Sequence, residues 1–468
     1  MSRTIKNFGH NVEFRPAKIC RPKSADEVLR ILQDNKGTKI RPVGSLHAWS
    51  PVAATDGISI DMSGIDSIEI SSNKKSVTVG AGCKVKHLLA KLASQGLTLP
   101  SVGLIDEQSI AGATATGTHG SGKQSLSHFI IAAAVVHYDA QGKAIITEIN
   151  SGPELLAARC SLGRLGIIVS LTLECREQYN VVEHARAYSN LPDAIAEEKD
   201  TPIQQFYLMP WSWTIFAHHR AESKKPRSKF AWLYRLYCFI VIDISLHLVV
   251  FSLAKLLKSK WMTRFFFKRI LPLTIIRKWH VVDDSSRQLV MEHELFRHCE
   301  IEVFVRRNDI ERTTKLLTDI VCVFGGQEMQ DGDQTRKQLN EIGRLDELLA
   351  MKGTYCHHYP ICYRRVLPDD TLISMTAPLA ENDEQDWYAI SFISYQWPND
   401  RGGFFSFAKF ISRLVADLYN GRCHWGKLNP LDSETNHRLY PRLNEFKQIA
   451  EKFDPEGAFS NEWLERVT

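Results

Sequence analysis

The sequence lacks the features of several protein classes. Its ten cysteines stand singly, without a C-x-x-C pair, so a disulfide framework is not expected in a chain of 468 residues, and we predict no metal site. The first ten residues lack the apolar core of a signal peptide, which argues against cleaved export and favours a reducing location on the cytoplasmic side. The formal net charge of +5, from 58 basic and 53 acidic side chains, is too balanced for a protein that binds nucleic acid.

Two common nucleotide-binding motifs are also missing. No segment carries the P-loop pattern G-x-x-x-x-G-K-[ST], and the glycines do not show Rossmann spacing after a strand. What the sequence does contain is ordinary material for a packed interior, with 44% hydrophobic and 24% charged residues. Its length predicts two or three domains.

The order of the predicted elements indicates an α+β protein. The capping-box pattern Ser24-Ala-Asp-Glu27 predicts that a helix begins there, and period-two alternation predicts strands nearby. Strands are predicted at residues 38–43, 58–62, 76–79 and 171–173, and a second helix at 85–92. This interleaving predicts a first domain over residues 1–178.

The second half of the chain shows the same mixture. Strands are predicted at residues 205–209, 300–305 and 388–393, and helices at 309–323 and 407–418. We therefore expect a second α+β domain over residues 179–420, with an apolar insert at about 225–285, and a C-terminal segment over 421–468.

A turn of small residues follows the strand predicted at 38–43. Gly44 and Ser45 let the backbone come close to a ligand and direct N–H groups at phosphate oxygens. His47 lies in the same turn, so it would be near whatever the turn binds. One such turn is weak evidence, because the same residues also suit a tight turn that carries a surface histidine.

A second segment of small residues is more specific. Glycine, alanine, serine and threonine fill nearly every position from Ser109 to Gly122, which predicts that no stable helix forms there. Such a segment can wrap a flat or phosphate-bearing ligand at close range. A flexible linker is the alternative, but Ile110 and the alanines make the segment too apolar for one. Its hydroxyl groups come from Ser109, Thr114, Thr116 and Thr118.

A third small-residue turn, Ser161-Leu-Gly163-Arg-Leu-Gly166-Ile-Ile168, says little alone. Together the three turns resemble the FAD domain of the vanillyl-alcohol-oxidase type, also called the PCMH type. The closest likeness is its sugar-lactone and alditol oxidase branch, which includes gulonolactone, galactonolactone and arabinonolactone oxidoreductases. In that branch a histidine in the first turn often bonds covalently to the flavin.

Two motifs near the C-terminus resemble the same branch. His424-Trp-Gly-Lys427 is one, and Phe453-Asp-Pro-Glu-Gly-Ala-Phe-Ser-Asn461 resembles the ending of its members. The resemblance spans nearly the whole chain except about 225–285. It implies an α+β fold with a two-subdomain FAD-binding domain and an α+β substrate, or cap, domain.

The resemblance also implies the cofactor, FAD, attached covalently through His47. Ala48 departs from the serine usual in the motif, and some relatives bind FAD without the bond. Residues placed at the cofactor by the resemblance are Val43, Gly44, Ser45, Leu46, His47, Ser109, Gly112, Thr114, Gly117, Thr118, His119, Gly166, Ile168, His424 and Lys427.

One cation is implied for the chemistry itself. Hydride transfer builds negative charge on one edge of the flavin, and a fixed cation there stabilises it. By resemblance Lys427 has this role, with a solvated lysine as the alternative.

The substrate-facing strand departs from the pattern of the branch, which often has Glu-x-Arg there. Arg364 takes the arginine position, but Cys362 stands where the glutamate is expected. A thiol cannot replace a carboxylate as a fixed anion unless its pKa is lowered, so both the base and the usual substrate are in doubt. His358 would share a strand face with Cys362 and is a candidate base, although a surface histidine is the commoner case.

The apolar insert has a membrane-like composition. Residues 236–254 are nearly all apolar, close to the length that spans a bilayer, but Asp243 lies in the middle. Basic residues flank the segment on both sides, which favours helices lying on an anionic membrane surface through residues 230–277. Buried helices or a subunit interface are the alternatives. The flanking basic residues are Lys224, Lys225, Arg227, Lys229, Lys255, Lys258, Lys260, Arg264, Lys268 and Arg269.

The leading functional hypothesis is therefore an enzyme that oxidises an alcohol carbon of a sugar, aldonolactone or polyol, as D-arabinono-1,4-lactone oxidase does. Hydride passes to FAD, and O₂ or an electron carrier reoxidises the flavin. The insert supports a second hypothesis, a membrane-associated flavoenzyme for a lipid-linked sugar or a sterol. The missing glutamate supports a third, a flavin-binding protein without activity.

Overall fold

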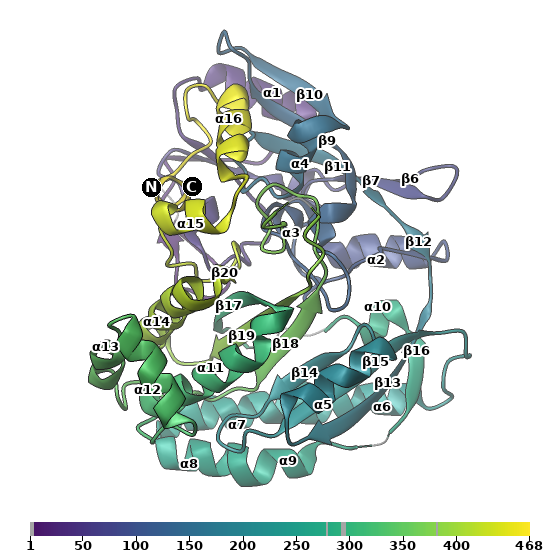
Figure 1. The fold of residues 1–468 in the computed structure, drawn as a ribbon. Coiled ribbons are helices and arrows are strands. Elements are labelled where there is room, and N and C mark those ends of the chain that lie inside the picture. The colour runs from purple at the N-terminus through teal and green to yellow at the C-terminus, as the bar shows by residue number, and fades with distance from the viewer. Residues whose placement is uncertain (1–3, 278, 292–295, 381) are drawn as a thin grey trace.

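Two sheet systems, at opposite ends of the molecule, organise the fold (Figure 1). The structure is a computed structural model, and it describes residues 4–277, 279–291, 296–380 and 382–468. Residues 1–3 of the N-terminal segment and residue 278 of the apolar insert lie outside this part of the chain.

The first system contains two small sheets. A parallel sheet has the order β3-β5-β4, and an antiparallel sheet has the order β10-β9-β11-β7-β6. The strands are β3 (Lys18–Cys20), β4 (Ile40–Val43), β5 (Ile58–Asp61), β6 (Ile68–Ile70), β7 (Ser76–Gly80), β9 (Ile130–Tyr138), β10 (Ala144–Ile149) and β11 (Ile167–Glu174). The helices around them are α1 (Ala25–Asp34), α2 (Val85–Ala93), α3 (Ile110–Ala115) and α4 (Gly152–Arg159). Two further strand pairs are β1 (Ile5–Lys6) with β2 (Glu13–Phe14), and β8 (Leu97–Thr98) with β12 (Arg176–Glu177).

The second system is one antiparallel sheet of eight strands, in the order β16-β13-β15-β14-β18-β19-β17-β20. Its strands are β13 (Asn180–Tyr188), β14 (Gln205–Leu208), β15 (Ile215–Ser223), β16 (Val281–Asp284), β17 (Cys299–Arg306), β18 (Ile361–Val366), β19 (Trp387–Ser394) and β20 (Arg422–Cys423). Every residue of β17 is buried, so both faces of the sheet are covered there. The helices of this half are α5 (Leu191–Ala196), α10 (Ser285–Gln288), α11 (Ile310–Phe324), α12 (Gly332–Glu341), α13 (Leu345–Ala350) and α14 (Gly402–Tyr419).

The apolar insert forms a helical hairpin below the eight-stranded sheet (Figure 1). Lys258, at φ 48°, adopts the left-handed conformation that ends the first arm, and the Ser259 hydroxyl caps the second arm by accepting from the Met262 N–H. The first arm, Ala231–Leu257, has 27 residues, and an 18-residue window of it has a mean hydropathy of 2.2, so it is long and apolar enough to cross a membrane. Its parts are α6 (Ala231–Tyr237), η5 (Cys238–Leu246), α7 (His247–Phe251) and η6 (Ser252–Leu257); the second arm contains α8 (Lys260–Phe265), η7 (Phe266–Ile270) and α9 (Leu271–Thr274).

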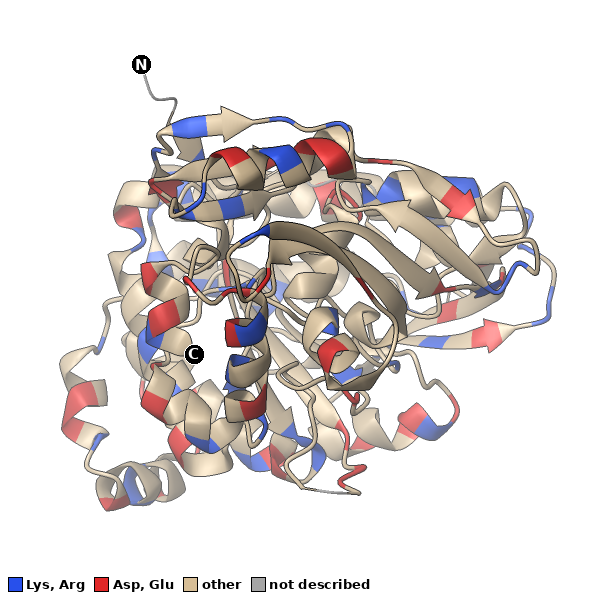
Figure 2. Ribbon diagram, turned by 90° about the horizontal axis from the view of Figure 1, so that it is seen from above, with Lys and Arg blue, Asp and Glu red and all other residues tan. Residues whose placement is uncertain are grey.

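The C-terminal segment returns to the first sheet system after β20. The Ile40 N–H donates to the Ala458 carbonyl at 2.8 Å, and the Lys39 ammonium donates to the Gly457 carbonyl at 2.8 Å. Its helices are α15 (Ser433–Leu439), α16 (Leu443–Phe453) and α17 (Glu462–Val467). Seen from above, Lys and Arg alternate with Asp and Glu over the ribbon and form no basic stripe (Figure 2).

The predicted α+β class is confirmed, and most predicted elements lie within two or three residues of their observed positions. One expectation was wrong: the glycine-rich segment does contain a short helix, α3. Burial explains the difference, since Ile110, Ala113 and Thr114 are at most 1% exposed and their small neighbours let the helix pack closely. Tertiary packing therefore outweighs the low helix propensity of glycine.

Candidate functional site

A cavity of about 770 Å³ lies between the glycine-rich turns, the eight-stranded sheet and the apolar insert. The turns form one end of its wall. The inward-facing side chains of strands β13, β14, β15, β17 and β18 form its floor, and the first arm of the insert covers it. Segments that are far apart in the sequence therefore enclose one space.

The first two glycine-rich turns contact each other at the cavity wall. A Cβ atom added to Gly44 would lie 1.8 Å from the Ser109 Oγ, a distance that no side chain tolerates. The sequence needs glycine at position 44 because this contact brings the two turns together. Their N–H groups and hydroxyls then border one side of the cavity, as a site for a phosphate-bearing ligand requires.

His47 faces the cavity from the first turn. The preceding residue, Leu46, has φ 56°, a left-handed conformation that is uncommon for leucine, and the Phe8 N–H donates to its carbonyl at 2.8 Å. The His47 ring stacks on the Phe8 ring with centroids 5.0 Å apart. Burial, with smaller effects from Lys427 and Lys84, lowers the pKa of His47 to about 4. The ring is therefore neutral at physiological pH.

The structure brings most of the predicted cofactor residues to the cavity wall. Those that line it are Val43, Gly44, Ser45, Leu46, His47, Ser109, Gly112, Thr118, His119, Gly166, Ile168, His424 and Lys427. Two do not line it. The Thr114 hydroxyl is fully buried and donates to the Ile110 carbonyl at 3.0 Å, and Gly117 turns the chain at φ 76° against Met375.

A row of side chains crosses the cavity floor. In the strand register, Glu302 of β17 is opposite Ser391 of β19, which is opposite Cys362 of β18, which is opposite Tyr207 of β14. The Ser391 hydroxyl donates to Glu302 Oε1 at 2.6 Å. The carboxylate expected at position 362 is thus present two strands away, at position 302.

Arg364 lies beside this carboxylate. Its Nη1 is 3.6 Å from Glu302 Oε1, and the nearby Cys362 and Glu302 raise the pKa of Arg364 against the effect of burial. Burial raises the pKa of the Cys362 thiol, which accepts from the Gln205 amide at 2.9 Å. Cys362 is therefore a neutral part of the floor, and the fixed negative charge comes from Glu302.

Lys427 forms a second charged pair in the cavity. Its ammonium group contacts the Glu300 carboxylate and lies 4.3 Å from the centre of the Trp49 ring. Trp49 is held in turn by the bond from its indole N–H to the His298 carbonyl, at 2.8 Å. The lysine is thus fixed in position at the cavity wall.

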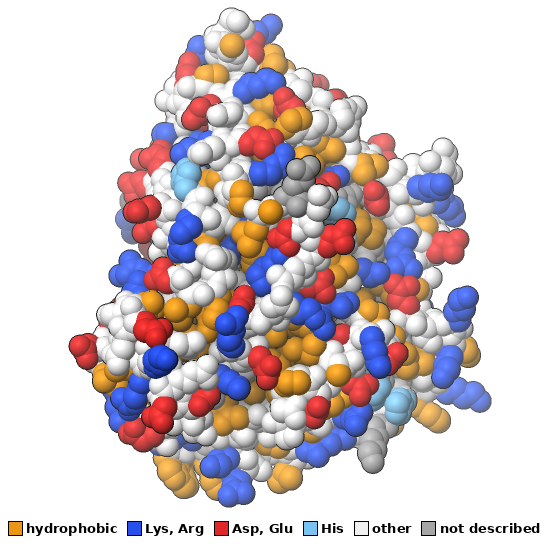
Figure 3. All heavy atoms as spheres, in the orientation of Figure 1, with side chains coloured by type: hydrophobic (Ala, Val, Ile, Leu, Met, Phe, Trp, Pro, Cys, Tyr) orange, Lys and Arg blue, Asp and Glu red, His pale blue; other side chains and the backbone are white. Residues whose placement is uncertain are grey.

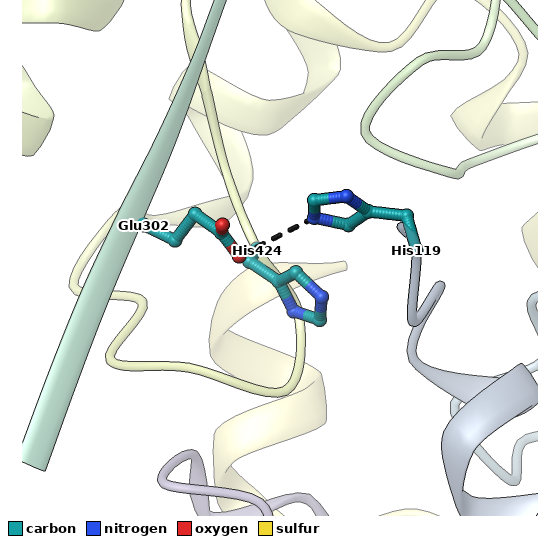
Figure 4. A group of neighbouring side chains, drawn as sticks. All are labelled: His119, Glu302 and His424. Atoms are coloured by element: carbon teal, nitrogen blue, oxygen red, sulfur yellow. Dashed lines mark hydrogen bonds and ion pairs between the residues drawn. The ribbon is translucent and has the colours of Figure 1, made fainter. Parts of the chain in front are cut away.

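Two histidines, His119 and His424, lie beside the Glu302 carboxylate (Figure 4). His119 Nε2 is 3.4 Å from Glu302 Oε2, and the donor atoms of His119, Glu302 and His424 all lie within 4.8 Å of one another. His424 Nδ1 accepts from the Gly426 N–H at 2.9 Å, and burial lowers the pKa of His424 far below its usual value. Burial opposes ionisation of Glu302, but His119, His424 and Lys427 together hold its pKa well below the usual range.

The structure does not bring His358 to the cavity, contrary to the prediction that it shares a face with Cys362. Strand β18 begins only at Ile361, so strand alternation does not extend back to residue 358. His358 Nε2 accepts from the Tyr395 N–H at 2.9 Å, and its Nδ1 donates to the Cys356 carbonyl at 3.0 Å. Both ring nitrogens are used by the backbone, so His358 stabilises the fold.

This arrangement makes stability depend on pH. Burial lowers the pKa of His358 to about 4, from 6.5 when unfolded, so its contribution is present above about pH 6.5 and is lost as pH falls towards 4. Glutamine can still accept from the Tyr395 N–H but cannot bind the proton. We expect His358→Gln to reduce the loss of unfolding free energy between about pH 7 and pH 5 by about 2 kcal/mol in urea titrations. The exposed His87, changed to glutamine, is the control. Equal pH dependence in the wild type and His358→Gln would contradict the assignment.

Sequence reasoning missed the acidic side chains of the floor. Glu300 and Glu302 are 4% and 1% exposed, and both lie on the strand that the sequence predicts at residues 300–305. The signal was present, because charged residues are rarely buried without partners and two of them at i and i+2 face the same side. Their partners, His119 and Lys427, were predicted separately.

Comparisons with known proteins agree with the fold and the cavity. The chain matches the family model "FAD binding domain" over residues 16–148 and the model "D-arabinono-1,4-lactone oxidase" over residues 194–467. A protein named long-chain alcohol oxidase from an uncultured marine euryarchaeote is 45% identical over 98% of this chain and 95% of its own length. L-gulonolactone oxidase from Mus musculus is 25% identical over 99% and 98%.

Solved structures show the same fold. The chain resembles a structure titled "Solvent-stable cholesterol oxidase" with a TM-score of 0.74 and 16% identity, over 99% of this chain and 97% of the other. The alternative of a flavin-binding protein without activity has no support among these relatives, which are named as alcohol or lactone oxidoreductases. The chain belongs to the D-arabinono-1,4-lactone oxidase family of FAD-dependent oxidoreductases acting on CH–OH groups.

Proposed function

We propose that this enzyme oxidises the terminal CH–OH carbon of a long-chain alcohol to the aldehyde, and that O₂ or an electron carrier reoxidises its flavin. The observation that carries the proposal is the apolar cover of the cavity. The insert places Leu236, Phe239, Ile242 and Leu246 along the cavity, beside Ile276. The name of the relative at 45% identity agrees with this substrate class.

The length of the cavity also suits a chain-like substrate. Its floor extends from Glu183 and Ala185 on β13 to Glu302 on β17. Five strand-to-strand steps separate β13 from β17, which at about 4.8 Å per step gives a span of roughly 24 Å. A monosaccharide lactone would fill only part of it.

Charged groups at the β13 end do not prevent an apolar tail from lying there, because they are paired. Glu183 is 1% exposed and accepts from His218 at 2.9 Å, from Arg220 at 2.5 Å and from Gln288 at 2.7 Å. The Tyr234 hydroxyl of the insert also donates to it. The polar atoms of this end are thus directed at each other.

The residues at the other end fit FAD. Gly44 and Ser109 make a close-packed wall that any larger residue at position 44 would disrupt, and the hydroxyl and N–H groups of the turns suit a pyrophosphate. His47, neutral and facing the cavity, suits the covalent attachment that the family resemblance implies. When bound, FAD accepts the hydride from the alcohol carbon.

The side chains of the floor then supply the remaining chemistry. We assign to the His119–Glu302 pair the role of accepting the proton of the substrate hydroxyl. Both residues line the cavity, and the Glu302 carboxylate lies beside Arg364. Arg364 would orient the substrate oxygen by donating to it. Lys427, held between Glu300 and Trp49, would stabilise negative charge that develops at the cavity wall.

A sugar lactone is the second candidate. The family model and the gulonolactone oxidases favour it, and Gln205, Tyr207 and His218 offer polar groups on the cavity floor. The two candidates differ in what they require of the insert. Only the long-chain alcohol needs its apolar side chains.

Anaerobic bleaching of the flavin by a substrate panel tests the proposal. We expect the second-order rate constant to rise about fourfold per added methylene along a series of primary alcohols, because each buried methylene contributes about 0.8 kcal/mol. D-arabinono-1,4-lactone and L-gulono-1,4-lactone should bleach the flavin slowly. Fast bleaching by a lactone, with no dependence on alcohol length, would favour the second candidate.

The chain offers a matched pair of variants for this assay. Leu233 and Leu236 are both 41% exposed on helix α6, but only Leu236 lines the cavity. With soluble alcohols and no lipid present, Leu236→Glu should weaken the dependence on chain length, and Leu233→Glu should leave it unchanged. Equal effects of the two variants would show that the tail does not lie under the insert.

A further inference from the structure

The insert carries an exposed apolar face. Of 18 large hydrophobic side chains that are exposed in the described residues, 14 lie between residues 230 and 276. Scattered single residues of this kind are normal on a soluble surface, but a cluster marks a contact site. The apolar face consists of Phe230, Trp232, Leu233, Leu236, Ile240, Leu248, Leu256, Leu257, Trp261, Met262, Phe265, Ile270, Leu273 and Ile276.

Positive charge surrounds this face. Between residues 224 and 277 the sequence has twelve lysines and arginines and one acidic residue, Asp243, which lies towards the cavity. Figure 3 shows hydrophobic side chains and Lys and Arg side by side at the lower edge of the molecule, where α8 and α9 lie in Figure 1. An apolar centre with a basic border complements an anionic lipid surface.

The opposite face of the insert is fixed to the protein. Tyr234 donates to Glu183, and Arg235 forms an ion pair with Asp283 at the start of the first arm. Further along, His247 Nε2 contacts the Tyr395 hydroxyl at 2.9 Å, and the Lys260 ammonium at the start of the second arm donates to the Gly353 carbonyl. These contacts hold the hairpin against the body along its length, so one face is bound and the other faces outward. A helix lying in the membrane interface needs this geometry, whereas a spanning helix would have to leave the body.

Part of the cavity wall belongs to the apolar face. Trp232, Leu236 and Ile276 line the cavity and are also 55%, 41% and 42% exposed. Whatever covers the apolar face therefore also covers this part of the wall. A lipid surface placed there would lie directly against the cavity.

We propose that this face docks on an anionic lipid bilayer and that the substrate alcohol enters the cavity directly from the lipid. Long-chain alcohols partition strongly into membranes, and passage through water would expose each of their methylenes to solvent, which is unfavourable. The docking is independent of which substrate is oxidised. The delivery of the alcohol rests on the function proposed above.

Vesicle co-sedimentation of the flavin-loaded enzyme tests the docking. On vesicles of phosphatidylcholine with about one-third phosphatidylglycerol, binding should be at least about tenfold stronger than on phosphatidylcholine alone, and high salt should weaken it. The variant Trp261→Asp/Leu273→Asp should lose this binding, because both side chains are exposed, at 66% and 84%, and neither lines the cavity. Ile146→Asp, with 39% exposure on strand β10 at the far end of the molecule, is the control and should bind as the wild type does.

Four outcomes would overturn the docking. Absence of vesicle binding is one, and equal binding to both vesicle types is another. The third is a stable dimer in light scattering that Trp261→Asp/Leu273→Asp converts to a monomer, because the face would then be a subunit interface. The fourth is retained vesicle binding by this variant, which would place the contact elsewhere on the protein.

A separate rate measurement tests whether the substrate alcohol enters the cavity from the lipid. With the alcohol dissolved in the anionic vesicles, Trp261→Asp/Leu273→Asp should oxidise it at least about tenfold more slowly than the wild type does, and both should oxidise a short water-soluble alcohol equally. Equal rates with the vesicle-borne alcohol would overturn delivery and leave docking intact. If no alcohol is oxidised by either protein while vesicle binding persists, the proposed function fails and the docking stands.

Discussion

Glu302→Gln is expected to lower the rate of anaerobic flavin reduction by about 10²–10⁴-fold while leaving the fold and FAD content unchanged. Glutamine keeps the size of the side chain and can still accept from the Ser391 hydroxyl, which is 2.6 Å away. It removes the negative charge next to Arg364 and the site that receives the hydroxyl proton. Stopped-flow measurement of reduction by a saturating alcohol isolates this step from reoxidation.

The hydrogen-bond partners of His119 and Glu302 determine where protons can reside in this pair. His119 Nδ1 is 3.0 Å from the Gly120 carbonyl, which can only accept, so this nitrogen carries a hydrogen. The other nitrogen, Nε2, is 3.4 Å from the Glu302 carboxylate, which also accepts. A proton between Nε2 and the carboxylate therefore satisfies both groups. This position between Nε2 and the carboxylate is the one to which we assign the hydroxyl proton.

The pH profile separates this role from a structural one. In the wild type the rate of flavin reduction should rise with pH, with an apparent pKa that belongs to the His119–Glu302 pair rather than to either residue. Glu302→Gln should not show this rise, which is the pH limb of the profile. Glu198→Gln is the control. Glu198 is 2% exposed and accepts from the Tyr388 hydroxyl at 2.7 Å, but it does not line the cavity. A similar loss of rate in Glu198→Gln, or an unchanged pH limb in Glu302→Gln, would contradict the assignment.

A metal centre at His119, Glu302 and His424 is the alternative to this role. The candidate metal-ligand atoms of His119, Glu302 and His424 lie within 4.8 Å of one another, but Arg364 lies beside the Glu302 carboxylate and Lys427 pairs with the neighbouring Glu300. We expect elemental analysis of the purified enzyme to find no stoichiometric metal. A chelator should accordingly leave the reduction rate unchanged.

The sequence predicted local features of the fold well, because their causes are local. The capping box at Ser24 gave the start of α1, where the serine hydroxyl accepts from the Glu27 N–H at 3.3 Å. The motif His424-Trp-Gly-Lys427 contributes His424 and Lys427 to the lining of the cavity. The helix α3 was missed because its stability comes from packing by distant parts of the chain, which intrinsic propensity does not describe.

The candidate site required knowledge of strand pairing. Cys362 and Glu302 are 60 residues apart in sequence. Only the strand register through Ser391 shows that the Glu302 carboxylate lies in the same row as Cys362, where the carboxylate was expected. Likewise, the composition of the insert predicted an apolar surface but not that its inner face would cover the cavity. Which face of an apolar helix is bound depends on tertiary contacts such as Tyr234 with Glu183.

The substitution His47→Ala is expected to have the second large effect, on the attachment of the flavin. We expect the wild-type protein to show a fluorescent band under ultraviolet light on a denaturing gel, and His47→Ala to show none, because alanine cannot form the covalent bond to the flavin that we propose for His47. The native variant should still contain FAD, since the remaining wall residues bind it without a bond. Its rate of flavin reduction should fall, because the covalent bond raises the potential of the flavin.

Two features of the first turn suit His47 as the proposed attachment point. Burial lowers its pKa to about 4, so its ring is neutral and able to form a bond, and the left-handed Leu46 and the Phe8 ring fix its direction. Both ring nitrogens of His119 contact the protein, at the Gly120 carbonyl and the Glu302 carboxylate. His119→Ala is thus the matched control and should keep the fluorescent band. A fluorescent band in His47→Ala, traced by mass spectrometry to the peptide containing His119 or His424, would place the bond on the opposite side of the cavity and contradict the role of the first turn.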